Sequence, residues 1–177
     1  METIYAEKIY RRHGKIPGPV GVAGLPARRY ILRMIHSILA AVDSSQRAPG
    51  VVAFAAEVAK RYGARLVLMR VLAVSQEFPP AAAHASDHFS EAQRQGAAAD
   101  LERLAAPHAG AIVEPPVIYA GQPWRAIIEK AKELSVDLIV VGSHGYGGLD
   151  RILGTTAGKV ANHADRSVLV VHEPVAT

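Results

Sequence analysis

The sequence has no cysteine and no long apolar run. Without cysteine, the 177-residue chain has no disulfide bond, no thiolate ligand for a metal ion and no cysteine nucleophile. No apolar run approaches the roughly 18 to 20 residues that cross a bilayer, so we expect no membrane partner. The lack of cysteine also fits a reducing compartment, and we expect a cytoplasmic protein.

The positive charge of the chain lies almost entirely in its first 33 residues. The formal net charge of the whole chain is +4. Residues 1–33 contain seven Lys or Arg against two Glu, a net of +5, and the remaining 144 residues contain 13 basic and 14 acidic groups, a net of −1. Domains that bind nucleic acid usually carry a basic face. A nearly neutral domain does not predict one, so we expect no nucleic-acid partner.

Residues 1–33 also differ from the rest in composition. They mix Pro, Gly and small apolar residues without helical or strand periodicity, and Pro17, Pro19 and Pro26 interrupt any signal-peptide core. We predict a basic, flexible N-terminal extension over residues 1–33 and one domain over residues 34–177. Two interpretations of the extension stay open: an unstructured or untranslated leader, and a basic tail that binds acidic partners.

Short apolar runs alternate with helical patterns after the extension. The apolar runs lie at residues 35–43, 64–74, 111–121, 136–142 and 167–172, and the helical patterns lie at residues 47–63, 87–106 and 123–135 and after a glycine-rich stretch. This alternation predicts an α/β fold, with a five-stranded parallel sheet between two helical layers in a Rossmann-like sandwich. Two prolines in the third apolar run predict a sheet edge or a bulge near its start.

The glycine-rich stretch GSHGYGGLDRILGTTAGKV starts at residue 142 and places five glycines in its first 13 residues. It follows the carboxyl end of the fourth predicted strand, the end at which parallel sheets bind ligands. Bare backbone N–H groups and a helix N-terminus bind phosphate well, and Thr155 and Thr156 add hydroxyl groups. The stretch therefore predicts a phosphate cradle in which Gly142 and Gly145 shape the turn and Gly154 precedes the helix. The alternative is that the glycines only shape a turn.

Two common phosphate motifs do not fit this stretch. The Walker pattern fails because GTTAGKV has only three residues between its glycines, and the dinucleotide fingerprint fails because Asp150 stands where its third glycine is needed. The stretch resembles instead the nucleotide-binding signature of the universal stress protein family: Gly, two residues, Gly, nine residues, Gly, and then Ser or Thr. Gly142 and Gly145 match the first part and Gly154 and Thr155 the second, across a spacer of eight residues in place of nine.

The resemblance extends over about residues 34–173, through the phrases AAVDSS, DLIVVGSHG and ADRSVLVVH. It implies the adenine nucleotide alpha hydrolase-like form of the Rossmann-like fold, and binding of ATP or a related adenine nucleotide. In ATP-binding members the acidic residue that ends the first strand lies at the nucleotide. That residue is Asp43 here, where it would accept hydrogen bonds from ribose hydroxyls or bind Mg²⁺. Val71 matches a position whose backbone meets adenine.

The resemblance implies a set of nucleotide-binding residues at the carboxyl ends of the strands. They are Ala41, Val42, Asp43, Val71, Gly142, Ser143, His144, Gly145, Gly154, Thr155 and Thr156. Two alternatives stay open: Asp43 caps the following turn through Ser44 and Ser45, and Val71 is simply core. The short spacer also leaves two outcomes open. Its flexible glycines absorb the missing residue, or Thr155 is displaced and binding weakens or changes its nucleotide preference.

The resemblance implies a universal stress protein that acts in the stress response through conformation, dimerisation or partner binding. Family members usually dimerise, often through the last strand, so we expect a homodimer through residues 167–172. A second hypothesis keeps this dimer as an interaction module that binds no nucleotide. A third is slow nucleotide hydrolysis involving His144 and Asp43. The sequence contains no recognisable set of nucleophile, base and orienting residue, so we assign no catalytic residue.

Overall fold

The structure is a computed structural model that describes residues 35–73, 89–108, 110–143 and 154–172. Residues 34–177 form one compact unit. The predicted extension lies outside the described residues, so the boundary at residues 33/34 stays a prediction. The elements in chain order are β1 (Ser37–Ala41), α3 (Ala48–Tyr62), β2 (Arg65–Ala73), α4 (Glu91–Ala105), β3 (Ile112–Val113), β4 (Val117–Gly121), α5 (Pro123–Glu133), β5 (Leu138–Gly142), α6 (Thr155–His163) and β6 (Ser167–Val171).

All strand pairs in the sheet are parallel, as the alternating pattern predicts. The order across the sheet is β3-β2-β1-β5-β6, and β4 also pairs with β2. β3 and β4 both pair with β2, and they are two parts of the single strand predicted at residues 111–121. Together they occupy one position in the sheet, which therefore has the five strand positions that were predicted. Val113 pairs with Leu66 and Val117 pairs with Met69, which leaves one extra residue on the outer strand. The two prolines therefore mark both an edge strand and a bulge.

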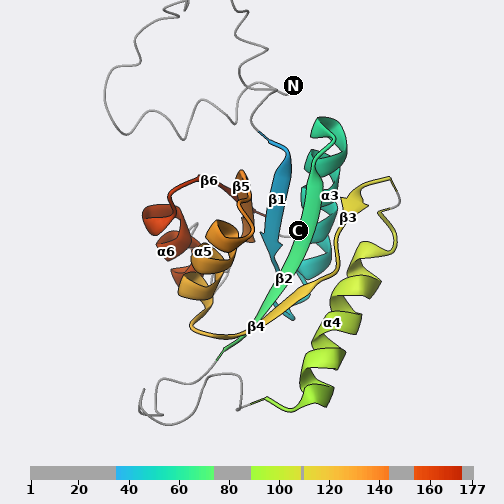
Figure 1. Cartoon of the computed structure of the whole chain (residues 1–177), viewed down its shortest axis with the longest axis vertical. Helices are drawn as coiled ribbons and strands as arrows, with labels where there is room; N and C mark the ends of the chain where they lie inside the picture. The colour runs from blue at the N-terminus through green and yellow to red at the C-terminus, as the bar shows by residue number, and fades with distance from the viewer. Residues whose placement is uncertain (1–34, 74–88, 109, 144–153, 173–177) are drawn as a thin grey trace, which may run out of the picture. The chain divides into compact units, whose positions relative to one another are not determined.

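The helices cover the two faces of the sheet in pairs, as Figure 1 shows. Even-numbered residues of β1 pack with α3 and α4, and Leu39 on the same strand packs with α5 and α6. This separation follows from the alternation of side chains along a strand. The two apolar clusters form the core, and both contain fully buried strand residues such as Ile38 and Ile139. The predicted three-layer α/β sandwich is confirmed.

Helix α3 packs closely against the sheet because its buried face is built from small residues. Those residues are Ala48, Val51, Val52, Ala55, Ala56 and Ala59. The helix ends at Gly63, whose φ of 63° lies in the left-handed region that glycine adopts readily. The close packing brings the first turns of α3 next to the carboxyl ends of β1 and β5.

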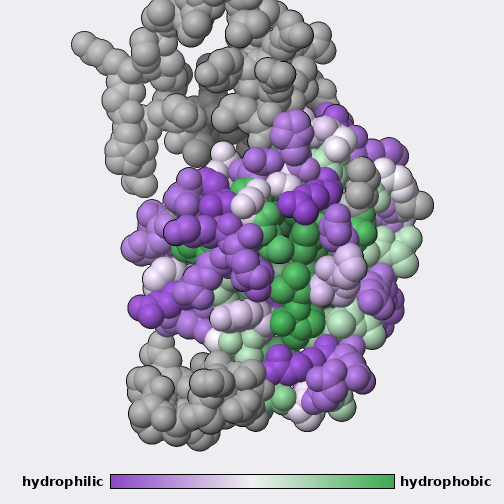
Figure 2. Space-filling view, in the orientation of Figure 1, coloured by the Kyte–Doolittle hydropathy of each residue, from purple (hydrophilic) through white to green (hydrophobic). Residues whose placement is uncertain are grey.

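One edge of the sheet is turned toward the viewer in Figure 2. A band of apolar side chains runs over the region where Figure 1 draws β2, β3 and β4, between more hydrophilic surfaces over the helices. Val113 and Tyr119 are two of the large apolar residues exposed in the described part of the chain, and both lie on this edge. Over the same ranges, no helix has the length and apolar character needed to cross a membrane.

Candidate functional site

The strand order reverses between β1 and β5. The chain runs outward from β1 through β2 to β3 and β4, and then returns to place β5 on the other side of β1. In parallel sheets a crevice forms at such a point, outside the carboxyl ends of the two strands. Ala41 pairs with Val141 in register, so the residues that follow each of them emerge side by side. The structure thus brings the predicted residues Val42 and Asp43 close to Gly142 and Ser143.

Two hydrogen bonds fix the end of β5 at this crevice. Arg47 Nη1, at the start of α3, donates to the carbonyl oxygen of Ser143 at 3.3 Å. The Ser143 backbone N–H donates to the Val171 carbonyl oxygen of β6 at 2.8 Å. The loops that leave β1 and β5 are therefore joined by an exposed arginine, which also places a positive charge at the crevice.

Asp43 is exposed and organises the turn between β1 and α3. Its Oδ1 accepts hydrogen bonds from the Ser45 backbone N–H at 3.0 Å and from Ser45 Oγ at 2.6 Å. This arrangement is an Asx turn, a local structure that Asp adopts readily. The turn-capping role left open from the sequence is thus present through Ser45, and a role at a ligand stays a prediction.

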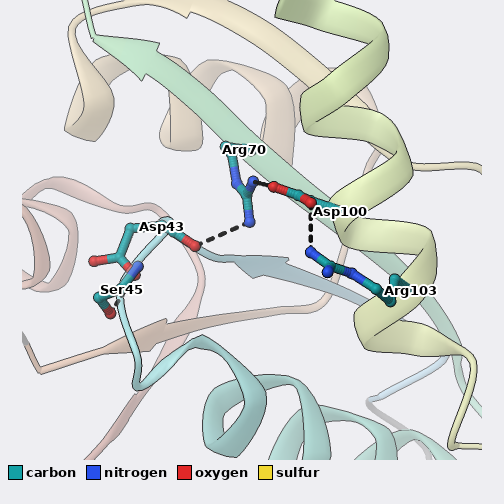
Figure 3. Close-up of polar contacts among 5 residues, drawn as sticks. All are labelled: Asp43, Ser45, Arg70, Asp100 and Arg103. Carbon is teal, nitrogen blue, oxygen red and sulfur yellow. Dashed lines mark hydrogen bonds and ion pairs between the residues drawn. The ribbon is translucent and has the colours of Figure 1, made fainter.

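The backbone of Asp43 is held from the opposite direction by Arg70. Figure 3 shows the Asp43 carboxylate pointing away from Arg70 while its carbonyl oxygen accepts a hydrogen bond from Arg70 Nη2 at 3.1 Å. Arg70 lies on β2 and is only 7% exposed. Its Nη1 donates to Asp100 Oδ2 on α4 at 3.1 Å, and Arg103 pairs with the other oxygen of Asp100.

The three apolar residues predicted for the site lie at the end of β1 or on β2, and they have packing roles. Val42 is 4% exposed and packs with α3, and its N–H donates to the Met69 carbonyl oxygen at 2.8 Å. Ala41 and Val71 are half-buried and pack on the face that α5 and α6 cover. Val71 pairs with Tyr119 on the outer strand, two residues beyond the pair of Met69 and Ala41. The core role of Val71 is present, and its predicted contact with adenine stays a prediction.

Gly142 has a packing reason to be glycine. A Cβ atom at this position would lie 3.0 Å from Val51 Cγ2 of α3. That separation is shorter than an ordinary van der Waals contact between carbon atoms. Close packing of α3 therefore explains this glycine without a ligand, although the same bare backbone would also admit one.

Helix α6 begins at the predicted glycine and threonines. Gly154 is the N-cap residue, Thr155 and Thr156 form the first turn, and among the described residues no side chain forms an N-cap hydrogen bond to this turn. Unpaired N–H groups at a helix N-terminus attract anions. The two remaining predicted residues, His144 and Gly145, and the eight-residue spacer lie outside the described residues. The effect of the shortened spacer therefore stays a prediction.

The sequence profile of the universal stress protein family matches residues 34–172. The chain belongs to this family. It is 34% identical over 140 residues to Universal stress protein A homolog 1 of Coxiella burnetii. This aligned region covers 76% of this chain and 94% of that protein. It is 31% identical over 148 residues to Universal stress protein YxiE of Bacillus subtilis. This aligned region covers 78% of this chain and 99% of that protein.

Solved universal stress proteins have the same fold. The universal stress protein UspA from Lactobacillus plantarum superposes with a TM-score of 0.63 at 28% identity, over 76% of this chain and 96% of that chain. A universal stress protein solved in complex with cAMP superposes with a TM-score of 0.60 at 24% identity, over 78% of this chain and 98% of that chain. The resemblance to the family and its Rossmann-like fold is therefore confirmed.

Sequence reasoning missed the two arginines that fix the loops of this universal stress protein site. A signal for Arg70 is present, because it is the one charged residue within the apolar run LVLMRVLAV. By the alternation of side chains along a strand, it lies on the same face as Leu66 and Leu68. Arg47 has no comparable signal, since its partner is a backbone oxygen 96 residues away. Within the described ranges, no group of three or more His, Asp or Glu is arranged to bind a metal ion.

Proposed function

We propose that this universal stress protein binds ATP or a related adenine nucleotide at the carboxyl ends of β1 and β5. Binding would act in the stress response through conformation, dimerisation or partner binding. The observation that carries the proposal is the reversal of strand order, which brings the Asp43 turn next to the end of β5. Universal stress proteins of this fold were solved in complex with cAMP and, from Archaeoglobus fulgidus, with dAMP.

The predicted site residues suit the parts of a nucleotide. The free N–H groups at the start of α6 and the hydroxyls of Thr155 and Thr156 suit the phosphates. The Arg47 guanidinium adds a positive charge at the end of β5. The backbone of Val71 would meet the adenine ring, and the Asp43 carboxylate would accept hydrogen bonds from the ribose.

Asp43 also fits a magnesium ion bound together with the phosphates. Mg²⁺ at nucleotide sites is usually held by one or two carboxylates, phosphate oxygens and water, so an exposed carboxylate such as that of Asp43 suits it. Such an ion would offset the negative charge of the phosphates. Asp43 is the residue of this site that would hold it.

Substitutions at Asp43 test the proposal because they separate charge from turn geometry. Asp43→Asn keeps an oxygen that accepts from Ser45, but it removes the negative charge. Ser45→Ala is the matched control, since it removes the 2.6 Å hydroxyl bond and leaves the carboxylate in place. We expect Asp43→Asn to weaken magnesium-dependent ATP binding about tenfold or more, and Ser45→Ala to weaken it much less.

Isothermal titration calorimetry of each variant with ATP, in the presence and absence of Mg²⁺, measures the change in ATP affinity that each substitution causes. Equal affinity of the wild type and Asp43→Asn in the presence of Mg²⁺ would remove Asp43 from the site. A larger loss in Ser45→Ala than in Asp43→Asn would show that only the turn geometry matters.

A second candidate function is a dimeric interaction module that binds no nucleotide. The observation that favours it is that a Cβ atom added at Gly142 would lie only 3.0 Å from Val51 Cγ2. Packing alone therefore explains this glycine. Absence of binding to ATP, ADP and cyclic AMP at millimolar concentration would support this candidate over the first.

We also propose that two copies of the chain pair through β6. This strand lies at one end of the strand order, and its residues from Val168 to Val171 are only half-buried within one copy. An edge strand offers unpaired backbone groups to another chain. The opposite edge is interrupted by Pro115 and Pro116, which disfavour regular pairing there. Light scattering at micromolar concentration should give the mass of a dimer, and a monomer mass would contradict the proposal.

A further inference from the structure

Arg70 carries a charge into the apolar layer between the sheet and α4. Leu66 and Leu68 precede it on the same face of β2 and are 0% and 1% exposed. The Arg70 side chain itself is 8% exposed. Burial of a charged group is costly, and replacing a buried ion pair by apolar residues is often neutral or stabilising. Fold stability alone therefore gives little reason for an arginine at this position.

The contacts of Arg70 form a connected path from the surface of α4 to the crevice, which Figure 3 shows. Arg103 pairs with Asp100, Asp100 pairs with Arg70 at 3.1 Å, and Arg70 donates to the Asp43 carbonyl oxygen at 3.1 Å. The Asp100 side chain is 46% exposed, so this path begins at the surface. The path joins α4 to the end of β1.

The path fixes the orientation of Asp43 from its backbone side. Arg70 holds the carbonyl oxygen, and Ser45 holds the carboxylate on the opposite side of the residue. A rotation of the peptide after Asp43 would break the bond to Arg70. Because that peptide leads into the Asx turn, its rotation would also move the carboxylate.

We propose that Arg70 is a positioning residue for the nucleotide site, and that Asp100 on α4 fixes the orientation of the Arg70 guanidinium. A change of charge at Asp100 therefore alters nucleotide affinity from outside the crevice. This inference rests on the proposed nucleotide binding and adds a place where a partner or a modification of α4 would act on it.

Three substitutions and one control test the inference in the full-length chain. Arg70→Met fills the same apolar layer without donors, Arg70→Lys keeps the charge, and Asp100→Asn leaves Arg70 without its carboxylate. Glu102→Gln is the control, because it makes the same loss of charge at an exposed position of the same helix. Isothermal titration with Mg²⁺–ATP gives the affinity of each variant, and thermal denaturation gives its stability.

We expect Arg70→Met to weaken ATP binding about tenfold, which corresponds to about 1.4 kcal/mol, while its melting temperature changes by only a few degrees. Asp100→Asn should weaken binding about threefold, Arg70→Lys should recover part of the loss, and Glu102→Gln should match the wild type. Unchanged affinity in Arg70→Met and Asp100→Asn would overturn the inference. A loss of affinity that follows the melting temperature equally across all variants would also overturn it.

Amide hydrogen exchange separates this inference from the proposed function. If the wild type does not bind nucleotide, the proposed function fails, and the positioning role is then measured in the free protein. Faster exchange of the Ser45 and Arg47 amides in Arg70→Met than in Glu102→Gln would support positioning of the turn. Equal exchange in the two variants would overturn it.

Discussion

Gly142 lies at the end of β5, where a side chain would meet α3. The missing Cβ would stand 3.0 Å from Val51 Cγ2, and Val51 is 4% exposed. Val51 has little freedom to move, because a β-branched side chain on a helix is confined largely to one rotamer. A methyl group at position 142 therefore has to displace α3 or the end of β5 by a few tenths of an ångström.

The size of the effect follows from two opposing contributions. Overpacking of a well-packed core costs about 1 to 3 kcal/mol. Replacing glycine by alanine at an accessible backbone conformation recovers about 0.4 to 1 kcal/mol by restricting the unfolded chain. We therefore expect Gly142→Ala to lower the free energy of unfolding by about 1 kcal/mol. Val51→Ala should lower it by about 1 to 3 kcal/mol through the cavity that it leaves.

The double variant decides whether the two residues interact as the structure implies. With Val51→Ala present, the methyl group of Gly142→Ala enters the vacated space, so the two losses should fall short of additivity by about 1 kcal/mol or more. Urea denaturation of the four proteins measures this coupling. Losses that add within about 0.5 kcal/mol would refute the packing explanation.

The same double variant also tests the role of Gly142 at a ligand. It carries a methyl group at the end of β5 without the contact to the Val51 side chain. If phosphate needs bare backbone there, the double variant binds ATP more weakly than Val51→Ala alone. If packing is the only reason for the glycine, the two variants bind with equal affinity.

Three further outcomes are expected. Asp137→Ala should lower the free energy of unfolding by about 2 kcal/mol, because Asp137 Oδ2 accepts from the N–H groups of His36 and Ser37 at 2.7 and 3.0 Å; a change below about 0.5 kcal/mol in urea denaturation would contradict this. Thr155→Val should weaken ATP binding severalfold in isothermal titration with little change in stability, and unchanged affinity would exclude its hydroxyl from the site. Val170→Pro should convert the dimer to a monomer in light scattering, because residue 170 directs its N–H away from β5; a persisting dimer would exclude pairing through β6.

The fold could be predicted because its signals are local. The prolines of the outer strand correctly indicated an edge and a bulge, since proline cannot donate to a neighbouring strand. The left-handed Gly63 ended α3 as predicted. The second helix was predicted to begin too early, at residue 87, whereas α4 begins at Glu91 behind a capping box of Ser90 and Gln93. That spacing of Ser and Gln is visible in the sequence as a helix start.

The candidate site could be predicted only in part, because its precise contacts join distant segments. Asp43 and Gly142 follow buried strands, so their placement at one edge of the sheet follows from topology. The bond between Arg70 and Asp100 depends on how α4 packs on β2, which no local pattern determines. The approach of Val51 to Gly142 likewise depends on the distance between a helix and the sheet.

Nucleotide released from the freshly purified protein tests the central claim most directly. The protein is denatured, the released compounds are identified by chromatography, and the stripped protein is titrated with ATP, ADP and cyclic AMP with and without Mg²⁺. We predict a stoichiometric adenine nucleotide, or binding at micromolar concentration to the stripped protein. No released nucleotide, together with no binding at millimolar concentration, would contradict the proposed function. The glycines would then serve only to shape the turn.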